Sequence, residues 1–365
     1  MKIILEASEA QNPERRGIGV QMRGWYEVAP FTAYPNVQFL LVSHDNEPYD
    51  PLPTAAQNLK RLRVRASTKE EYVDKLYNLH ANLVFFPHAS RQYFRKSVTK
   101  CAGIDYGMED LYCRDYIAPR PIEDFFAEHT FAFTHYHAII TVSKTSRRDL
   151  TWLFPEAKGK LSIVYPSIGQ SRYDQQSLKR SALPKPLQQC QYFLVIGYEH
   201  KKNILRIAQA FNQFKQKTGS TTKLVLVGKP GYGSHEIDAT INRLATSSDI
   251  LRLGYVSDEQ KAAMFTFAHA VVALPIYEGF GLSALEGLYA DKVVLVSNNG
   301  SLKEVVGNAG FTADPFSVSD IGNKLAYIDQ LRSNPRAKAI TLQRAKFDLS
   351  TQARRLIDVL VAASK

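Results

Sequence analysis

The sequence has few cysteines and no long apolar segment. Only three cysteines occur among 365 residues, Cys101, Cys113 and Cys190, and their spacing matches no metal-binding motif. Reduced thiols in a cytoplasmic protein are therefore expected. No run approaches the eighteen consecutive apolar residues that a membrane-spanning helix needs. The first residues, MKIILEASEA, hold an apolar run too short for a signal-peptide core, and they predict a buried strand.

Charge of one sign is in excess. The net charge is +11, while 45% hydrophobic and 22% charged residues are ordinary for a globular protein. A basic protein favours anionic partners, which are nucleotides, nucleic acids or anionic membranes. Two basic clusters, 58–65 (NLKRLRVR) and 91–100 (RQYFRKSVTK), accompany no recognised nucleic-acid module. They indicate either two solvated faces or peripheral contact with anionic lipid or a phosphate-bearing acceptor, and a nucleic-acid partner is not expected.

Short β-branched runs alternate with helix-like stretches twice along the chain. The first set includes KIIL, VQFLLV, ANLVFF, HAIITVS and LSIVY, and the second includes YFLVIG, TKLVLVG, ILRLGYV, AVVALP and KVVLVS. Such alternation predicts an α/β protein with two Rossmann-like, doubly wound parallel sheets. We expect a first domain over residues 1–168, a linker over 169–190 and a second domain over 191–344. Ligands of such sheets bind at the carboxyl ends of the strands.

The stretch YEGFGLSALEG, residues 277–287, follows one of these strands. Gly279 and Gly281 permit a sharp turn and a close approach of the backbone to a ligand. The helix predicted from about Leu282 or Ser283 offers free N–H groups to a phosphate. Two glutamates flank this turn: Glu286 can accept the hydroxyls of a ribose, and Glu278 can reach a group beyond the phosphates. The alternative is that both glutamates are solvated and the glycines only turn the chain.

Three other strand ends carry residues suited to a nucleotide. VIGYEHKKN, residues 195–203, delivers Lys201 and Lys202 after Gly197, and a lysine there suits a diphosphate as a point charge. LVLVGKPGYG places Gly228 at a second strand end, and LGYVSDEQ offers the backbone near Val256 to a base. The turn Gly17-Ile18-Gly19 after the first strand is the topological position for another phosphate contact. Each signal alone is weak, since a solvated lysine pair is equally compatible.

In their chain order these stretches resemble the retaining GT-B glycosyltransferases of glycosyl transferases group 1. This family includes bacterial mannosyl-, glucosyl- and rhamnosyltransferases acting on cell-surface glycans. HAIITVSKTSRRDL and SNNGSLKEVVGNAGFTADP extend the resemblance over most of the chain. It implies the GT-B fold, a nucleotide-sugar donor in the second domain, an acceptor mainly on the first, and no cofactor or obligatory metal. It also implies that a C-terminal helix, 345–365, crosses back to the first domain.

The resemblance assigns site residues one by one. The family's E-x7-E pair falls on Glu278 and Glu286, and its phosphate lysine falls on Lys202. Glu278, Lys202 and Asp105 are the expected catalytic residues. The implied donor site comprises Gly17, Ile18, Gly19, Gly197, Lys201, Lys202, Gly228, Val256, Glu278, Gly279, Phe280, Gly281, Leu282, Ser283 and Glu286.

One departure concerns a His-Asp pair found beside the donor sugar in many relatives. If Asp105 is that aspartate, Ile104 stands where histidine is expected. His88, in FFPHAS, either lines the site with Asp105 or is a capped loop residue.

The expected function is transfer of a hexose, with GDP-mannose favoured, to a glycan or lipid-linked acceptor with retention of configuration. The work would be done in the cytoplasm or at the inner face of the membrane. The alternatives are a nucleotide-sugar-binding protein without transfer, or a GT-B epimerase.

Overall fold

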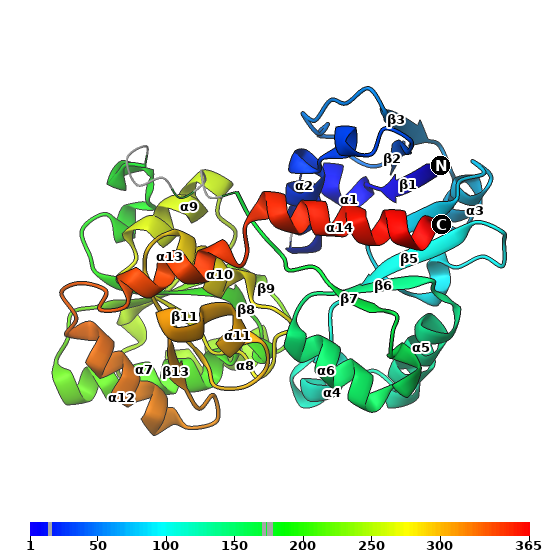
Figure 1. Cartoon of the computed structure of the whole chain (residues 1–365). Helices are drawn as coiled ribbons and strands as arrows, with labels where there is room; N and C mark the ends of the chain where they lie inside the picture. Colours follow the sequence, from blue (N-terminus) through cyan, green and yellow to red (C-terminus); the bar gives the residue numbers. More distant parts are fainter. Residues whose placement is uncertain (14–16, 170–172, 174–177) are drawn as a thin grey trace. The chain divides into compact units, whose positions relative to one another are not determined.

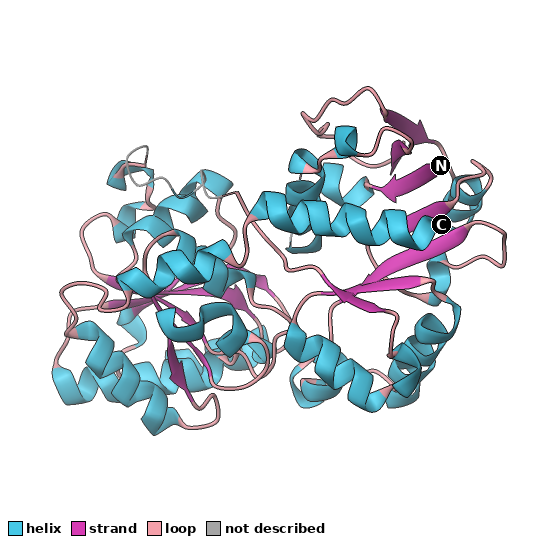
Figure 2. Cartoon of the chain, in the orientation of Figure 1, coloured by secondary structure: helices cyan, strands magenta, loops and turns pink. Residues whose placement is uncertain are grey.

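The computed structural model describes residues 1–13, 17–169, 173 and 178–365. The chain forms two compact units. The first comprises residues 1–108, 121–169 and 347–365, and the second comprises residues 109–120 and 170–346. Figure 2 shows that strands and helices alternate in both units. Within the described ranges, no helix is long and apolar enough to cross a membrane.

The first unit is built on a seven-stranded sheet with the order β3-β2-β1-β4-β5-β6-β7. Figure 1 labels β1, β2, β3, β5, β6 and β7 of this sheet. All its pairings are parallel. The strands are β1 (Lys2–Glu6), β2 (Gln38–His44), β3 (Leu59–Val64), β4 (Leu83–Phe86), β5 (Lys100–Asp105), β6 (Ala138–Thr141) and β7 (Leu161–Ile163). Its helices are α1 (Ser8–Gln11), α2 (Gly17–Val28), α3 (Lys69–Tyr77), α5 (Ile122–His135), α6 (Lys144–Leu153) and α14 (Leu349–Ser364).

The second unit has a six-stranded parallel sheet with the order β10-β9-β8-β11-β12-β13. Its strands are β8 (Tyr192–Tyr198), β9 (Lys223–Pro230), β10 (Ile250–Arg252), β11 (Ala270–Ala273), β12 (Val293–Ser297) and β13 (Phe311–Ala313). Its helices are α4 (Glu109–Tyr112), α7 (Ile204–Thr218), α8 (Ser234–Asn242), α9 (Asp258–Phe267), α10 (Leu282–Tyr289), α11 (Leu302–Val306), α12 (Val318–Asp329) and α13 (Ala337–Ala345). Two doubly wound parallel sheets are the α/β architecture that the alternating pattern predicts.

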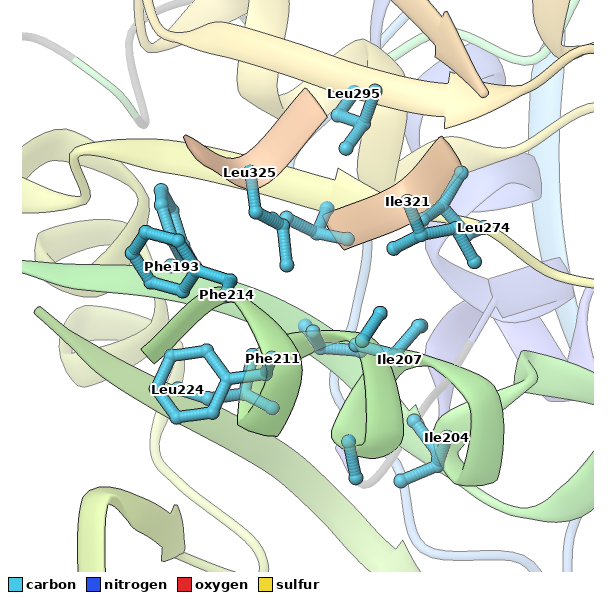
Figure 3. Close-up of a cluster of buried hydrophobic side chains, with 14 of the residues drawn as sticks. Phe193, Ile204, Ile207, Phe211, Phe214, Leu224, Leu274, Leu295, Ile321 and Leu325 are labelled. Carbon is cyan, nitrogen blue, oxygen red and sulfur yellow. The ribbon is translucent and has the colours of Figure 1, made fainter. Parts of the chain in front are cut away.

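Apolar periodicity explains why α7 covers one face of the second sheet. Its buried residues recur at three- and four-residue spacing, as an amphipathic helix requires, and Gly219 ends it in the left-handed conformation. Figure 3 shows the resulting core between α7, α12 and the strands. It includes Phe193, Ile204, Ile207, Phe211, Phe214, Leu224, Leu274, Leu295, Ile321 and Leu325. This packing fixes the strand ends that carry the candidate site.

The last helix, α14, packs within the first unit. Its buried apolar side chains lie against α2 and against β1, β4, β5 and β6. The Gln352 side-chain oxygen accepts a hydrogen bond of 3.0 Å from the Tyr165 N–H, and the Ser167 hydroxyl donates to the Phe347 carbonyl. The C-terminal segment is therefore an integral part of the first unit.

Candidate functional site

Side chains at the end of β12 and just after it hold the loop that follows β11 by hydrogen bonds. The side chains of Ser297, Asn299 and Ser301 donate hydrogen bonds of 2.6–2.8 Å to backbone carbonyls of residues 275–280. Small polar residues after a buried strand thus satisfy a turn whose own carbonyls have no sheet partner. The backbone on both sides of Glu278 is consequently held in one conformation.

Gly281 makes the turn from this loop into α10 possible. Its φ of +99° lies in the left-handed region, and a Cβ there would collide with the Leu302 side chain. As the N-cap of α10 it supplies no side-chain hydrogen bond to the first turn. The Ala284 N–H donates to the Gly281 carbonyl at 3.1 Å, so the positive end of the helix dipole and the N–H groups ahead of Ala284 are what this helix start offers to an anion.

Lys202 and Glu278 form an ion pair beside this helix start. Lys202 ends the 3₁₀ turn 200–202 that follows β8, and Gly197 leaves room for its stem, because a Cβ at 197 would lie 2.7 Å from the Lys202 Cγ. The two side chains are only 23% and 16% exposed. Burial opposes the charge of Lys202, but attraction and hydrogen bonding to the Glu278 carboxylate outweigh it and raise the pKa of Lys202. The lysine is therefore a fixed positive charge.

A small pocket, open to solvent, lies where these groups meet. Lys202, Glu278, Gly281 and Ser283 line its polar side. The apolar lining comprises Val195, Ile196, Val272, Ala273, Leu274, Pro275 and Leu302. A cation, a carboxylate and a helix N-terminus at the carboxyl ends of β8 and β11 make a place for a phosphate linked to a hydroxylated group.

Lys201 lies next to this pair with partners of its own. Its Nζ is 2.5 Å from a Glu109 carboxylate oxygen and 3.6 Å from one of Glu199. Burial lowers its tendency to be charged, and the neighbouring carboxylates, Glu109 foremost, more than compensate and raise its pKa. Its backbone carbonyl accepts a 3.0 Å hydrogen bond from the Ile276 N–H. This bond links the lysine turn, residues 200–202, to the glutamate loop, residues 275–280.

Glu286 lies in the second turn of α10 and is 5% exposed. One of its oxygens accepts hydrogen bonds of 2.6 Å from the Lys261 ammonium and 2.7 Å from the Tyr173 hydroxyl. The alternative that both glutamates merely face solvent is therefore wrong. Neither Lys261 nor Tyr173 was predicted, because a lysine on α9 and a tyrosine in the linker carry no local signal of their partner.

The glycines of the neighbouring strand ends allow the backbones to approach closely. Gly228, with φ +149°, would place a Cβ 3.2 Å from the Cα of Gly197, and its N–H donates to the Gly254 carbonyl at 2.9 Å. Val256 follows as a partly buried residue before α9. The structure thus places Gly197, Gly228 and Val256 at the carboxyl edge of the second sheet, as predicted, whereas their contacts with a nucleotide stay predictions.

The remaining predicted residues belong to the first unit. Gly17, Ile18 and Gly19 form the first turn of α2, and residues 14–16 of the same stretch lie outside the described residues. Asp105 is the last residue of β5. The structure therefore does not bring these residues together with Lys202 and Glu278 in one unit, and their role toward the donor stays a prediction.

Asp105 has a histidine partner that the sequence did not reveal. His129 of α5 places its Nε2 3.3 Å from an Asp105 oxygen, and the Gly107 N–H donates to the other at 2.8 Å. Ile104, where the resemblance expects histidine, is buried in the sheet. His88 lies two residues after β4, with its Nε2 3.8 Å from a Glu9 oxygen and its ring 5.4 Å from that of Tyr106. Burial, with the nearby Lys69 charge, lowers the pKa of His88.

The basic clusters are largely engaged within the first unit. Arg61 donates to backbone carbonyls of residues 52 and 54, and Arg63 pairs with Asp45 at 3.2 Å. Arg95 pairs with Asp74. These three arginine side chains therefore already have partners within the first unit. Among the residues that the structure describes, no three His, Cys, Asp or Glu side chains gather in a way that could hold a metal ion.

Comparison with known proteins places this geometry in a family. The model of "Glycosyl transferases group 1" matches residues 175–344. The O-antigen chain mannosyltransferase B of Escherichia coli is 30% identical over 278 residues, which cover 74% of this chain and 69% of that protein. The α-1,3/1,6-mannosyltransferase ALG2 of Dictyostelium discoideum is 27% identical over 198 residues, 47% of each chain.

The fold is shared with proteins of much lower sequence identity. The UDP-forming α,α-trehalose-phosphate synthase of Burkholderia xenovorans superposes with a TM-score of 0.73 at 12% identity, covering 100% of this chain and 99% of that one. Together with the two parallel sheets, this likeness confirms the GT-B fold.

Proposed function

This chain belongs to the group 1 glycosyl transferases, and on that premise we propose that it moves a mannosyl residue from GDP-mannose to a glycan or lipid-linked acceptor in the synthesis of a cell-surface polysaccharide. The observation that carries the proposal is the Lys202–Glu278 pair in the pocket beside the start of α10. It offers a cation for the donor diphosphate and a carboxylate for the hydroxyls of the sugar.

The transfer proceeds with retention of configuration and without a metal ion. The acceptor oxygen bonds to the anomeric carbon on the face from which the nucleotide leaves, and the departing phosphate oxygen takes the hydroxyl proton. Lys202, Lys201 and the first turn of α10 stabilise the charge that develops on this phosphate, and the rigid 275–280 loop positions the sugar. No protein base is needed in this step.

The choice of donor rests on the relatives. The two mannosyltransferases cited above favour mannose, whereas the trehalose-phosphate synthase that shares the fold is UDP-forming. UDP-glucose is therefore the competing donor. The acceptor assignment rests on the O-antigen enzyme alone.

Thermal unfolding with GDP-mannose, GDP, UDP-glucose and UDP, each with and without chelator, tests donor and metal requirement together. A ligand at a hundred times its Kd stabilises the folded state by about 2.7 kcal/mol. Stabilisation by the guanine nucleotides with chelator present supports the proposal. Stronger stabilisation by UDP-glucose than by GDP-mannose would make UDP-glucose the donor. Loss of nucleotide binding in the presence of chelator would overturn the metal-free mechanism.

Two alternatives keep the same site. A nucleotide-sugar-binding protein without transfer would bind GDP-mannose and release no GDP in the presence of acceptor glycans. An epimerase would convert the sugar nucleotide without any acceptor. Product analysis by chromatography of the nucleotides separates both from a transferase.

A further inference from the structure

Residues 109–120, named the clasp segment below, leave the first unit after Met108 and rejoin it at Pro121, yet they pack with the second unit. The segment consists of α4 and the 3₁₀ turn Arg114–Tyr116. Neither element is long enough to be stable alone. Its position therefore depends on the side chains that it places against the second unit.

The clasp segment contacts residues of the candidate site and their immediate neighbours. Glu109 pairs with Lys201, and the ring of Tyr112 lies over that of Tyr277 with centroids 4.7 Å apart. The Cys113 thiol lies 3.9 Å from the Tyr277 carbonyl. Tyr277 immediately precedes Glu278, so the segment contacts both the lysine turn and the glutamate loop.

The far end of the clasp segment is held by one arginine. Arg206 of α7 lies over the ring of Tyr116 at 5.8 Å and over that of Phe316 at 5.4 Å. A guanidinium NH₂ group of Arg206 also donates to the Tyr116 hydroxyl at 3.4 Å. Cation–π contacts of this kind are worth about 0.5–1 kcal/mol at exposed sites. These contacts involve neither Glu109 nor Lys201, so loss of that ion pair leaves them in place.

We propose that Glu109 occupies the anion position of Lys201 in the ligand-free protein, and that a diphosphate displaces it and loosens the clasp segment around Cys113. The inference rests on the proposed function, since it requires a diphosphate at this lysine. A lysine ammonium is a point charge that either a carboxylate or a phosphate can neutralise, so the two anions compete. The Glu109–Lys201 pair is partly exposed, at 33% and 22%, and it is therefore weak enough to exchange.

Cys113 is a built-in reporter of this movement. It belongs to the segment, and its side chain is fully buried. Burial foremost, with Glu109 and Glu278 adding to it, raises the pKa of the Cys113 thiol to about 12. Because the thiolate is the reactive form, the thiol should be inert while the clasp segment is docked. Cys101, buried in the first unit, is the internal control on the same chain.

The first measurement is calorimetric binding of GDP, UDP and pyrophosphate to the full chain. Glu109→Gln removes the competing charge, so the best-binding diphosphate should bind about two- to fivefold more tightly, the range expected for a partly exposed ion pair. Asp110→Asn is the matched control, because Asp110 lies on the same segment and pairs with Arg120 at 3.0 Å, away from Lys201. It should leave the affinity unchanged. Unchanged or weaker binding by Glu109→Gln overturns the competition.

The second measurement is labelling of the thiols by a maleimide, read peptide by peptide by mass spectrometry. Diphosphate should raise the labelling rate of Cys113 and leave that of Cys101 unchanged, and Glu109→Gln should raise it without ligand. Glu199→Gln removes the other carboxylate near Lys201 but changes a residue outside the clasp segment, so it should leave the Cys113 rate unchanged.

The outcomes separate the two proposals. If no diphosphate binds the wild-type chain, the proposed function fails and this inference fails with it. If diphosphate binds but protects Cys113 or leaves its labelling unchanged, the donor site stands and the displacement of Glu109 is wrong. Lys201→Ala provides the last check, because it should uncouple Cys113 labelling from diphosphate.

Discussion

The carboxyl edges of the two sheets both carry carboxylates, but these carboxylates have different partners. At the second edge, Lys202 and Glu278 are paired with each other beside an open pocket. At the first edge, Glu6 is buried and accepts hydrogen bonds from the Tyr72 hydroxyl at 3.1 Å and the Ser8 N–H at 3.0 Å. Asp105 is likewise held by its histidine.

This difference shows what makes a strand end suitable for an anionic ligand. A carboxylate satisfied by neutral donors carries no cation that a phosphate could use, whereas a lysine–glutamate pair can exchange one anion for another. Topology alone makes both edges equivalent. The side chains that neutralise each carboxylate decide between them, and the following substitutions test this decision.

The largest effect is expected from Lys202→Ala. Truncating one partner of a buried charge pair costs about 2–5 kcal/mol, so GDP should bind at least about thirtyfold more weakly. Lys229→Ala is the control, because Lys229 lies near the end of the neighbouring strand β9 but is exposed and lies over the Tyr255 ring. Equal losses in both variants, measured by calorimetry, would mean that only the general positive field matters.

Substitutions of Glu286 and Glu278 should weaken the binding of different ligands. If Glu286 accepts ribose hydroxyls, Glu286→Gln loses charge-assisted hydrogen bonds of roughly 1.5–3 kcal/mol each, and GDP binds about ten- to a hundredfold more weakly. The same change leaves the Lys261 ammonium without its carboxylate, so the melting temperature should also fall. Glu278→Gln should spare GDP and weaken intact GDP-mannose. Small, equal effects on both ligands would contradict the assigned roles.

Glu6→Gln should change stability and not nucleotide binding. Burial raises the pKa of Glu6 above its unfolded value. The stability that this group contributes is therefore complete below its unfolded pKa of about 4.5 and is lost as pH rises through the folded pKa. Since glutamine does not titrate, the variant should gain stability relative to wild type between pH 4.5 and 7. Denaturant titrations across this pH range measure the difference in unfolding free energy between variant and wild type. A difference that does not change with pH would show that folding does not raise the pKa of Glu6.

The smallest effect is expected for membrane binding. We expect any association with anionic vesicles to be salt-sensitive, because it would depend on the basic side chains of Lys60, Arg61, Arg63, Arg65, Arg95 and Lys96. With three of these arginines bound to backbone or carboxylate groups, we expect only weak sedimentation with anionic vesicles at low salt. Release on raising the salt concentration is expected from screening. Absence of sedimentation at low salt removes the peripheral-membrane proposal.

The apolar strands were readable from sequence because parallel strands buried on both faces are continuous hydrophobic runs. Strands β5 (KCAGID) and β13 (FTA) were not among the predicted runs, because they are short of β-branched residues. The edge strand β3, LKRLRV, was also missed, because its lysine and two arginines are exposed at the edge of the sheet and indicate a basic surface. The glycine turn at 279–281, the lysines after β8 and Glu278 were predicted as site residues from local sequence. Long-range partners were not. Glu109, Lys261, Tyr173 and His129 lie 92, 25, 113 and 24 residues from the groups that they contact, and one sequence holds no record of such contacts.

The packing of α14 has a consequence for folding during translation. Residues 347–365 cover the first sheet with Ala353, Leu356, Ile357 and Leu360. The first unit therefore begins synthesis before the second but cannot bury this surface until the second has left the ribosome. During that interval the nascent first sheet exposes an apolar face, which is prone to aggregation until α14 docks.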